Sequence, residues 1–240
     1  EWRHYGGDVG NTRYSGLDQI NAENFSDLEL VWRMKTDNFG PEPEYNFQST
    51  PLMVDGVVYT TAGTRRTVVA VDAGTGAYLW MHRLDEGQRA EEAPRRLSGR
   101  GLAYRDNGGS GQVIYVTPGY QMIALDAATG EPCADFGANG RVSLREGIGD
   151  TPCYEYYATS PPLVQGNLVI VGTLVQDNLR TDAPSGVVRA FDAQSGELRW
   201  AWDPVPPNGS RPPPGEGSYT PGTPNAVSYT HLTLPTNREV

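Results

Sequence analysis

Arg100 is the residue whose type and setting most clearly indicate chemistry, because it stands between Gly99 and Gly101. Its planar guanidinium can pair with a carboxylate or another pair of oxygens through two parallel hydrogen bonds. The two glycines let the backbone approach a ligand closely. A lone arginine is more often a surface charge, so the flanking glycines are what favour a binding role at this position.

Amide, hydroxyl and carboxylate groups occur at three further places. Gln48 precedes a predicted strand, where its amide can bond a carboxylate or simply face solvent. Thr159 and Ser160 stand at the head of another predicted strand, ahead of two prolines that stiffen the chain. Asp177 and Asn178 lie at the end of a predicted strand, where the sequence departs from the pattern of the other strands. Their oxygens suit a hard cation, although an Asx turn would explain the same pair of residues.

The histidines and cysteines give weaker indications of a functional site. His4, His82 and His231 fall outside these motifs and are interpreted as surface or packing residues. The two cysteines, Cys133 and Cys153, form no Cys-x-x-Cys pattern, which argues against a zinc site. They can form a disulfide in an exported protein or remain two unrelated thiols, and their spacing does not decide between these alternatives.

A repeated phrase shows which elements must position these residues. "AVDAGTG" at residues 70–76 returns as "ALDAATG" at 124–130 and as "AFDAQSG" at 190–196. In each copy an apolar strand ends at an aspartate, and the turn that follows ends at a glycine. The aspartate can accept hydrogen bonds from backbone N–H groups further along the turn, and glycine accepts a positive φ without strain. Each copy therefore predicts a β-hairpin, and its recurrence indicates a repeat architecture.

Each repeat also contains a strand pair before the hairpin, with tight-turn sequences such as "VDG" between apolar runs. Four short strands per unit are typical of a β-propeller blade, which buries its faces against neighbouring blades. We therefore predict an all-β fold, a β-propeller with four-stranded antiparallel blades at about residues 48–84, 99–145 and 158–203. These are about three blades, whereas closed propellers typically have four to eight.

Two flanking segments complete the expected arrangement. Residues 28–36 are predicted as a strand of an incomplete or ring-closing blade, because Trp32 holds the place that Trp80 and Trp200 hold in later units. Residues 85–98 are predicted as a charged loop.

The chain divides into residues 1–226, the N-terminal part of the propeller, and residues 227–240, a tail interpreted as non-native or disordered, with a strand opening a fourth blade as the alternative. The start "EWRHYGGD" is typical of a mature or trimmed N-terminus.

Composition excludes several classes of protein. Hydrophobic residues make up 38% of the chain, too many for a disordered protein. The formal net charge of −10 argues against nucleic acid as a partner, because phosphates require a basic face. We find no apolar run long enough to span a membrane.

The chain resembles the pyrroloquinoline quinone (PQQ) dependent dehydrogenases, the quinoproteins of the glucose and alcohol dehydrogenase type. The resemblance covers about residues 2–225. It rests on an ordered set of segments, among them "WRHYGGDVGNTRYSGLDQIN", "STPLMVDGVVYTT", "SGRGLAYRD", "MIALDAATGEPCADFGANGRVSL", "TSPPLVQGNLVIVG" and "SGVVRAFDAQSGELRWAWDP". It implies an eight-bladed propeller in which PQQ and a Ca²⁺ ion lie near the central axis.

The resemblance also implies roles for single residues. Arg100 matches the arginine that contacts PQQ, Thr159 the threonine placed against it, and Asp177 a calcium ligand. The residues expected to bind the cofactor are Gln48, Arg100, Thr159, Ser160 and Asn178. Asp177 is the candidate for the metal.

Some family features are missing from this chain. Alcohol-type members stack adjacent cysteines on PQQ where this chain has Pro94 and Arg95, so that disulfide platform is excluded. Arg96 falls where glucose-type members often have histidine, and its guanidinium plane could stack on the ring. The family's catalytic aspartate and calcium-bound asparagine belong to later blades, so no catalytic residue can be named here.

The function implied is that of an N-terminal fragment of a PQQ- and Ca²⁺-dependent dehydrogenase, which oxidises an aldose sugar or an alcohol by hydride transfer to the quinone. The resemblance further implies ubiquinone or cytochrome c as electron acceptor and a periplasmic location, either soluble or attached to the membrane through parts outside this chain. The alternative is a non-catalytic propeller scaffold built from the same repeat.

Overall fold

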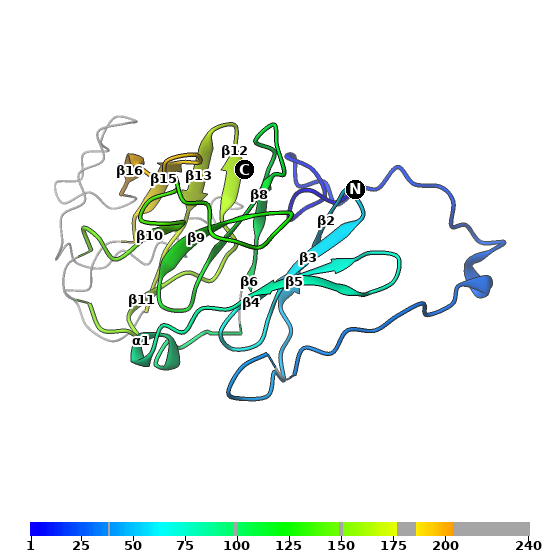
Figure 1. Cartoon of the computed structure of the whole chain (residues 1–240), viewed down its shortest axis with the longest axis horizontal. Coiled ribbons are helices and arrows are strands. Elements are labelled where there is room, and N and C mark those ends of the chain that lie inside the picture. The colour runs from blue at the N-terminus through cyan, green and yellow to red at the C-terminus, as the bar shows by residue number, and fades with distance from the viewer. Residues whose placement is uncertain (38, 98–99, 149–150, 177–185, 204–240) are drawn as a thin grey trace, which may run out of the picture.

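Three four-stranded antiparallel sheets dominate the computed structural model, which describes residues 1–37, 39–97, 100–148, 151–176 and 186–203. The first contains β2 (Leu52–Val54), β3 (Val57–Ala62), β4 (Thr67–Asp72) and β5 (Tyr78–His82). The second contains β7 (Ala103–Arg105), β8 (Gln112–Val116), β9 (Gln121–Asp126) and β10 (Arg141–Ser143). The third contains β12 (Leu163–Gln165), β13 (Leu168–Val171), β15 (Val188–Asp192) and β16 (Leu198–Trp202). The sheets lie side by side in chain order (Figure 1), which confirms the three predicted blades.

The remaining elements are short. β1 (Ser49–Thr50) pairs in parallel with β6 (Arg100–Gly101), and β11 (Tyr156–Tyr157) pairs antiparallel with β14 (Leu174–Val175). The described residues also contain the helical elements η1 (Phe25–Asp27) and α1 (Gln88–Glu91). Helix α1 lies within the segment predicted as a charged loop, and its Arg89 donates a hydrogen bond to the Gly119 carbonyl at 2.9 Å. Within the described ranges, no helix is long and apolar enough to cross a membrane.

The inner strands are buried on both faces because each sheet is covered by its neighbours. Along β9, Met122 and Ala124 join a core shared with the third sheet. The alternate residues Ile123 and Leu125 join a core shared with the first sheet. Since successive side chains of a strand point to opposite faces, β9 packs against both neighbours at once. This explains why the inner strands are continuous apolar runs rather than alternating ones.

The repeated turn has the same hydrogen bonds in all three sheets. Asp72 accepts bonds from the Thr75 backbone N–H at 2.8 Å and from the Thr75 hydroxyl at 2.7 Å, and the Gly76 N–H donates to the Asp72 carbonyl at 2.8 Å. Asp126 and Asp192 accept the corresponding pairs of bonds in the second and third sheets. The predicted equivalence of the three aspartates is therefore confirmed.

Asp192 should make stability depend on acid pH. A bond from the Ser195 N–H and an ion pair with Arg199 at 2.9 Å lower the pKa of the Asp192 carboxyl from 3.8 to about 2. A lowered pKa stabilises the fold above the unfolded value, and this stabilisation disappears as the pH falls from about 4 to about 2. In the full-length protein, Asp192→Asn should cost about 1–2 kcal/mol of unfolding free energy at pH 7 and almost nothing near pH 2. Urea unfolding across this pH range checks the result, with the exposed Asp18→Asn as control; an equal loss at both pH values would refute it.

Tryptophan side chains connect one sheet to the turn of the next. The Trp32 indole N–H donates to the Ala73 carbonyl at 2.9 Å, and that of Trp80 donates to the Ala127 carbonyl at 2.9 Å. A Cβ atom on Gly130 would lie 2.5 Å from a ring carbon of Trp80, so only glycine fits beneath this ring. Trp80 thus packs between neighbouring sheets as predicted.

The second sheet reaches the third by different means. No tryptophan follows its turn, and Phe136 is fully buried instead, in the core between the second and third sheets. The Gly137 N–H donates to the Ser195 carbonyl at 2.8 Å, and Val142 lies under the turn glycine Gly196. Phe136 and the Gly137–Ser195 backbone hydrogen bond therefore connect the second and third sheets, as Trp80 connects the first and second.

The prediction that residues 28–36 form a strand is wrong. They form no strand in the structure, although Trp32 docks as its position suggested. A strand requires a hydrogen-bonded neighbour, and within the described residues none pairs with this segment.

Of the two alternatives for the cysteines, a disulfide or two free thiols, the structure shows the second. Cys133 and Cys153 are both free thiols, and burial raises the pKa of Cys133.

Candidate functional site

The parallel pair β1–β6 places Gln48 next to the Arg100 backbone. Ser49, which follows Gln48, pairs with Arg100, and Thr50 pairs with Gly101. β1 is anchored to the end of β3, because the buried Ser49 and Thr61 hydroxyls share a hydrogen bond of 2.9 Å. Gln48 and the Arg100 backbone, which lie far apart in the sequence, are thus held close together, one just before β1 and one in β6, which leads into the second sheet.

Gly101 brings this pair close to the third sheet. Its φ of +154° is rarely adopted by residues with a side chain, and a Cβ atom there would lie 3.2 Å from the Cβ of Pro161. The β6 backbone can approach Pro161 this closely only because residue 101 is glycine. The Arg100 side chain and Gly99 lie outside the described part of the structure, so the contacts of the guanidinium remain a prediction.

Thr159 and Ser160 occupy the segment between β11 and β12. The Ala158 carbonyl just before them accepts a hydrogen bond from Arg66 at 3.0 Å, and two prolines follow them. Proline fixes its own φ and restricts the residue before it. The segment is therefore held at both ends, and the two hydroxyls are presented from a restrained backbone.

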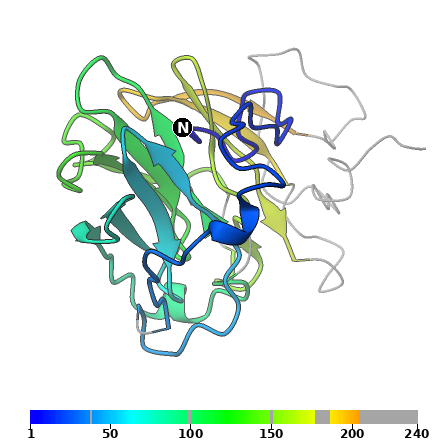
Figure 2. The same ribbon diagram turned by 90° about the vertical axis from the view of Figure 1, so that its right-hand side faces the viewer.

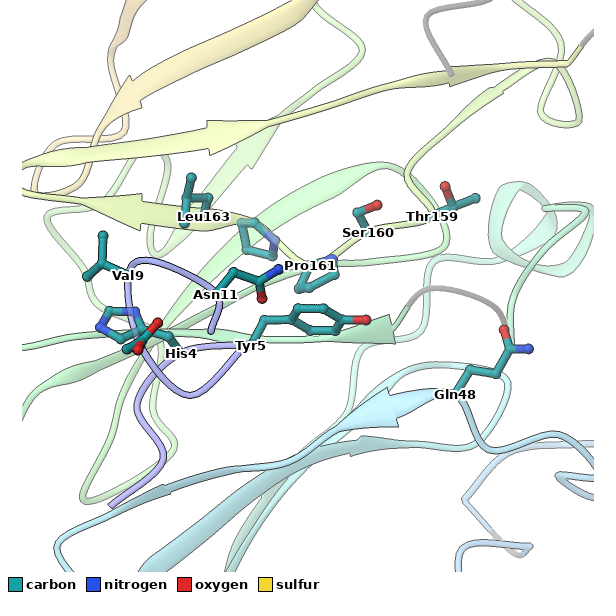
Figure 3. A pocket seen from close by; sticks show the side chains of 12 residues that line it. His4, Tyr5, Val9, Asn11, Gln48, Thr159, Ser160, Pro161 and Leu163 are labelled. Carbon is teal, nitrogen blue, oxygen red and sulfur yellow. The ribbon is translucent and has the colours of Figure 1, made fainter. Parts of the chain in front are cut away.

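Gln48, Thr159 and Ser160 line one cavity of about 470 Å³, which we call the Gln48–Thr159 cavity. Figure 3 shows Gln48 on the side of the first sheet and the two hydroxyl residues on the segment that enters β12. Tyr5 points from the N-terminal loop towards the space between them. Three of the predicted cofactor-binding residues, from the segment before β1 and the segment between β11 and β12, therefore converge on one site.

The N-terminal loop forms another side of this cavity, which sequence reasoning missed. His4, Asp8 and Asn11 line it together with Tyr5. The loop is tied to the first sheet by the Trp2 N–H, which donates to the Met53 carbonyl at 2.8 Å. Figure 2 shows the dark blue loop between the cyan first sheet and the yellow third sheet.

Glycine, aspartate and asparagine in the opening residues, at Gly6, Asp8 and Asn11, could have indicated that this loop contains tight turns. Asn11 has a left-handed φ of 54°, and a Cβ on Gly6 would overlap the Asn11 side chain. The Thr12 hydroxyl and backbone N–H both donate to Asp8 and lower the pKa of its carboxyl. Asparagine, aspartate and glycine at such spacing are typical of tight turns, but not of a particular ligand.

The donor set of the cavity fits PQQ. An amide and two hydroxyls converge there, and the Arg100 backbone lies beside Gln48. A flat molecule with several carboxylate and carbonyl oxygens needs such donors at its edge. The cavity volume is also within the range of small-molecule sites.

Asp177 and Asn178 fall outside the described residues, and the described ranges contain no group of three or more His, Cys, Asp or Glu side chains placed to hold a metal. Pro94, Arg95 and Arg96 line a second cavity of about 280 Å³, where Arg96 forms an ion pair with Glu42 at 3.0 Å.

A family model described as the PQQ glucose/ethanol/alcohol dehydrogenase β-propeller domain matches residues 2–233. The chain belongs to this family. Its resemblance to quinoprotein dehydrogenases is thus confirmed, and its sheets are blades of a β-propeller.

Several members show how the chain relates to longer proteins. It is 36% identical to a quinate/shikimate dehydrogenase (quinone) of Acinetobacter baylyi, over 86% of this chain and 28% of that protein. It is 33% identical to the glycerol dehydrogenase large subunit of Gluconobacter oxydans, over 94% of this chain and 31% of that subunit. The solved quinohemoprotein alcohol dehydrogenase of Comamonas testosteroni is 28% identical, with a TM-score of 0.67, over 90% of this chain and 28% of that one. The chain spans less than a third of the length of each of these relatives.

Proposed function

We propose that the full-length protein containing this chain is a PQQ- and Ca²⁺-dependent dehydrogenase that oxidises an aldose sugar or an alcohol. The observation that carries the proposal is the convergence of Gln48, Thr159 and Ser160 on one cavity beside the Arg100 backbone. Family membership supports the cofactor. The relatives are named for quinate or shikimate, glycerol and glucose, which all offer a hydroxyl-bearing carbon for oxidation.

Bound PQQ supplies a quinone that accepts a hydride from the substrate carbon, which the protein fold alone cannot do. This chain's own residues bind and orient. The Gln48 amide N–H and the hydroxyls of Thr159 and Ser160 would donate to the carboxylate or carbonyl oxygens of PQQ. The Arg100 guanidinium would add a charged fork from the neighbouring strand. The N-terminal loop, through Tyr5, lines one side of the cavity, where it would limit the entry of water.

Asp177 is proposed to ligate Ca²⁺, because calcium prefers carboxylate oxygens. In the full-length enzyme, Asp177→Ala should raise the Ca²⁺ concentration needed for half-maximal activity by at least about tenfold, the usual cost of disturbing a metal site. Activity is measured against free Ca²⁺ at saturating PQQ, with Asp106→Ala on the β7–β8 turn as control. If the Ca²⁺ dependence of Asp177→Ala equals that of the wild type, Asp177 is not a ligand.

The function itself is tested by reconstitution. Full-length apoprotein is mixed with PQQ and Ca²⁺, and dye-linked oxidation is measured with glucose, ethanol, glycerol and quinate. We expect oxidation of at least one of them that requires PQQ. A folded protein that fails to bind PQQ would favour a non-catalytic scaffold. Ubiquinone or cytochrome c as electron acceptor, and a periplasmic location, complete the proposal on the basis of the family resemblance.

A further inference from the structure

Arg66 is an almost completely buried arginine, 3% exposed, in the turn between β3 and β4. Among the described residues, its guanidinium donates hydrogen bonds to backbone carbonyls in three separate segments. Those of Val116 and Ala158 lie at 2.9 and 3.0 Å, and those of Arg95 and Arg96 both lie at 3.4 Å. Arg66 thus connects the first blade to the end of β8 in the second, to the segment that enters the third, and to the loop before β6.

The backbone of Arg66 is strained. Its φ of 52° is left-handed, a conformation that glycine or asparagine adopts more readily than arginine. A strained position persists when the surrounding contacts over-determine it, and such positions cluster at functional sites. The contacts with the carbonyls of Val116, Ala158, Arg95 and Arg96 help to hold this strained residue in place.

The second blade shows how the repeat creates this position. Its equivalent turn ends at Tyr120, also left-handed at 67°, and the Tyr120 N–H donates to Thr117 at 3.1 Å as Arg66 does to Gly63 at 3.1 Å. The Tyr120 hydroxyl shares a hydrogen bond of 2.6 Å with Thr173 of the next blade. Both turns therefore project a large side chain onto the following blade, but Arg66 reaches two blades and a loop.

These contacts end beside the Gln48–Thr159 cavity. Ala158 directly precedes Thr159, and residues 95 and 96 belong to the loop that leads into β6, which pairs with the strand after Gln48. In metal sites, residues that orient the ligands are nearly as important as the ligands, and mutating them typically costs about 10- to 100-fold in affinity.

We propose that Arg66 is a positioning residue for the cofactor cavity, which sets Thr159 and the loop before β6 relative to the first blade. The proposal rests on the proposed PQQ function. Only a guanidinium supplies donors in a planar fork to several carbonyls, whereas a lysine ammonium is a compact charge that cannot span them.

The test uses full-length apoprotein and equilibrium titration with PQQ at fixed Ca²⁺. Arg66→Gly keeps a residue that favours the left-handed turn, so its effect reports the loss of the guanidinium. We expect PQQ to bind about 10- to 100-fold more weakly. At saturating PQQ, the KM for the substrate should stay at the wild-type value, and added methylguanidinium should restore part of the PQQ affinity.

Arg105→Met is the matched control, because Arg105 also joins two blades. It donates to Gln112 at 2.8 Å within the second blade and to Asn167 at 2.7 Å in the third. This variant should lose stability but bind PQQ as the wild type does. If Arg66→Gly does not fold, Arg66→Lys decides by the same titration and should also bind PQQ more weakly.

The outcomes separate the two proposals. Wild-type apoprotein that does not bind PQQ refutes the proposed function. Wild-type binding together with unchanged affinity in the folded Arg66 variant, or an equal loss in Arg105→Met, overturns the positioning role alone.

Discussion

Replacing Arg100 with alanine in the full-length protein is expected to weaken PQQ binding by about 2–5 kcal/mol, the usual cost of removing one partner from a buried charge pair. The β6 backbone pairs with β1, the strand directly after Gln48, and approaches Pro161 at Gly101. Arg100→Lys should also lose affinity, because an ammonium cannot supply the planar fork that pairs with a carboxylate.

The affinity is measured by titrating apoprotein with PQQ at fixed Ca²⁺. The exposed Arg33→Ala serves as control and should bind as the wild type does. Wild-type affinity in Arg100→Ala would place the guanidinium outside the cofactor site, and an equal loss in both variants would show a general effect of net charge.

Phe136→Ala should lower the unfolding free energy by about 3–5 kcal/mol, as expected for truncating a fully buried phenylalanine. Phe136 is 0% exposed in the core between the second and third blades, where no tryptophan docks on the turn. Phe25→Ala is the matched control, because Phe25 is 68% exposed and should lose little stability. Urea unfolding of the full-length protein measures both, and a loss below about 1 kcal/mol for Phe136→Ala would contradict its role as the interblade anchor.

The blades could be predicted because their signals are local. Asp72 and its copies accept hydrogen bonds from residues only three positions away, so the turn is encoded in one short phrase. The position of Trp80 relative to that phrase likewise predicted its packing between sheets. Residues 28–36 were predicted wrongly as a strand for the opposite reason, since strand formation depends on a partner elsewhere.

The candidate site could be predicted only in part. The chemistry of Gln48, Thr159 and Ser160 was expected from the family resemblance, but their convergence on one cavity required the structure. The N-terminal loop with Tyr5, and the contacts of Arg66, depend on segments that meet across blades. A local sequence pattern cannot predict contacts between blades, because the contacting residues are far apart in the sequence.

A structure of the full-length protein with PQQ and Ca²⁺ tests the central claim most directly. The account predicts PQQ in the Gln48–Thr159 cavity, with the Gln48 amide and the Thr159 hydroxyl within hydrogen-bond distance of its oxygens and the Arg100 guanidinium paired with it. PQQ bound at another place, with none of these three side chains in contact, would contradict the account.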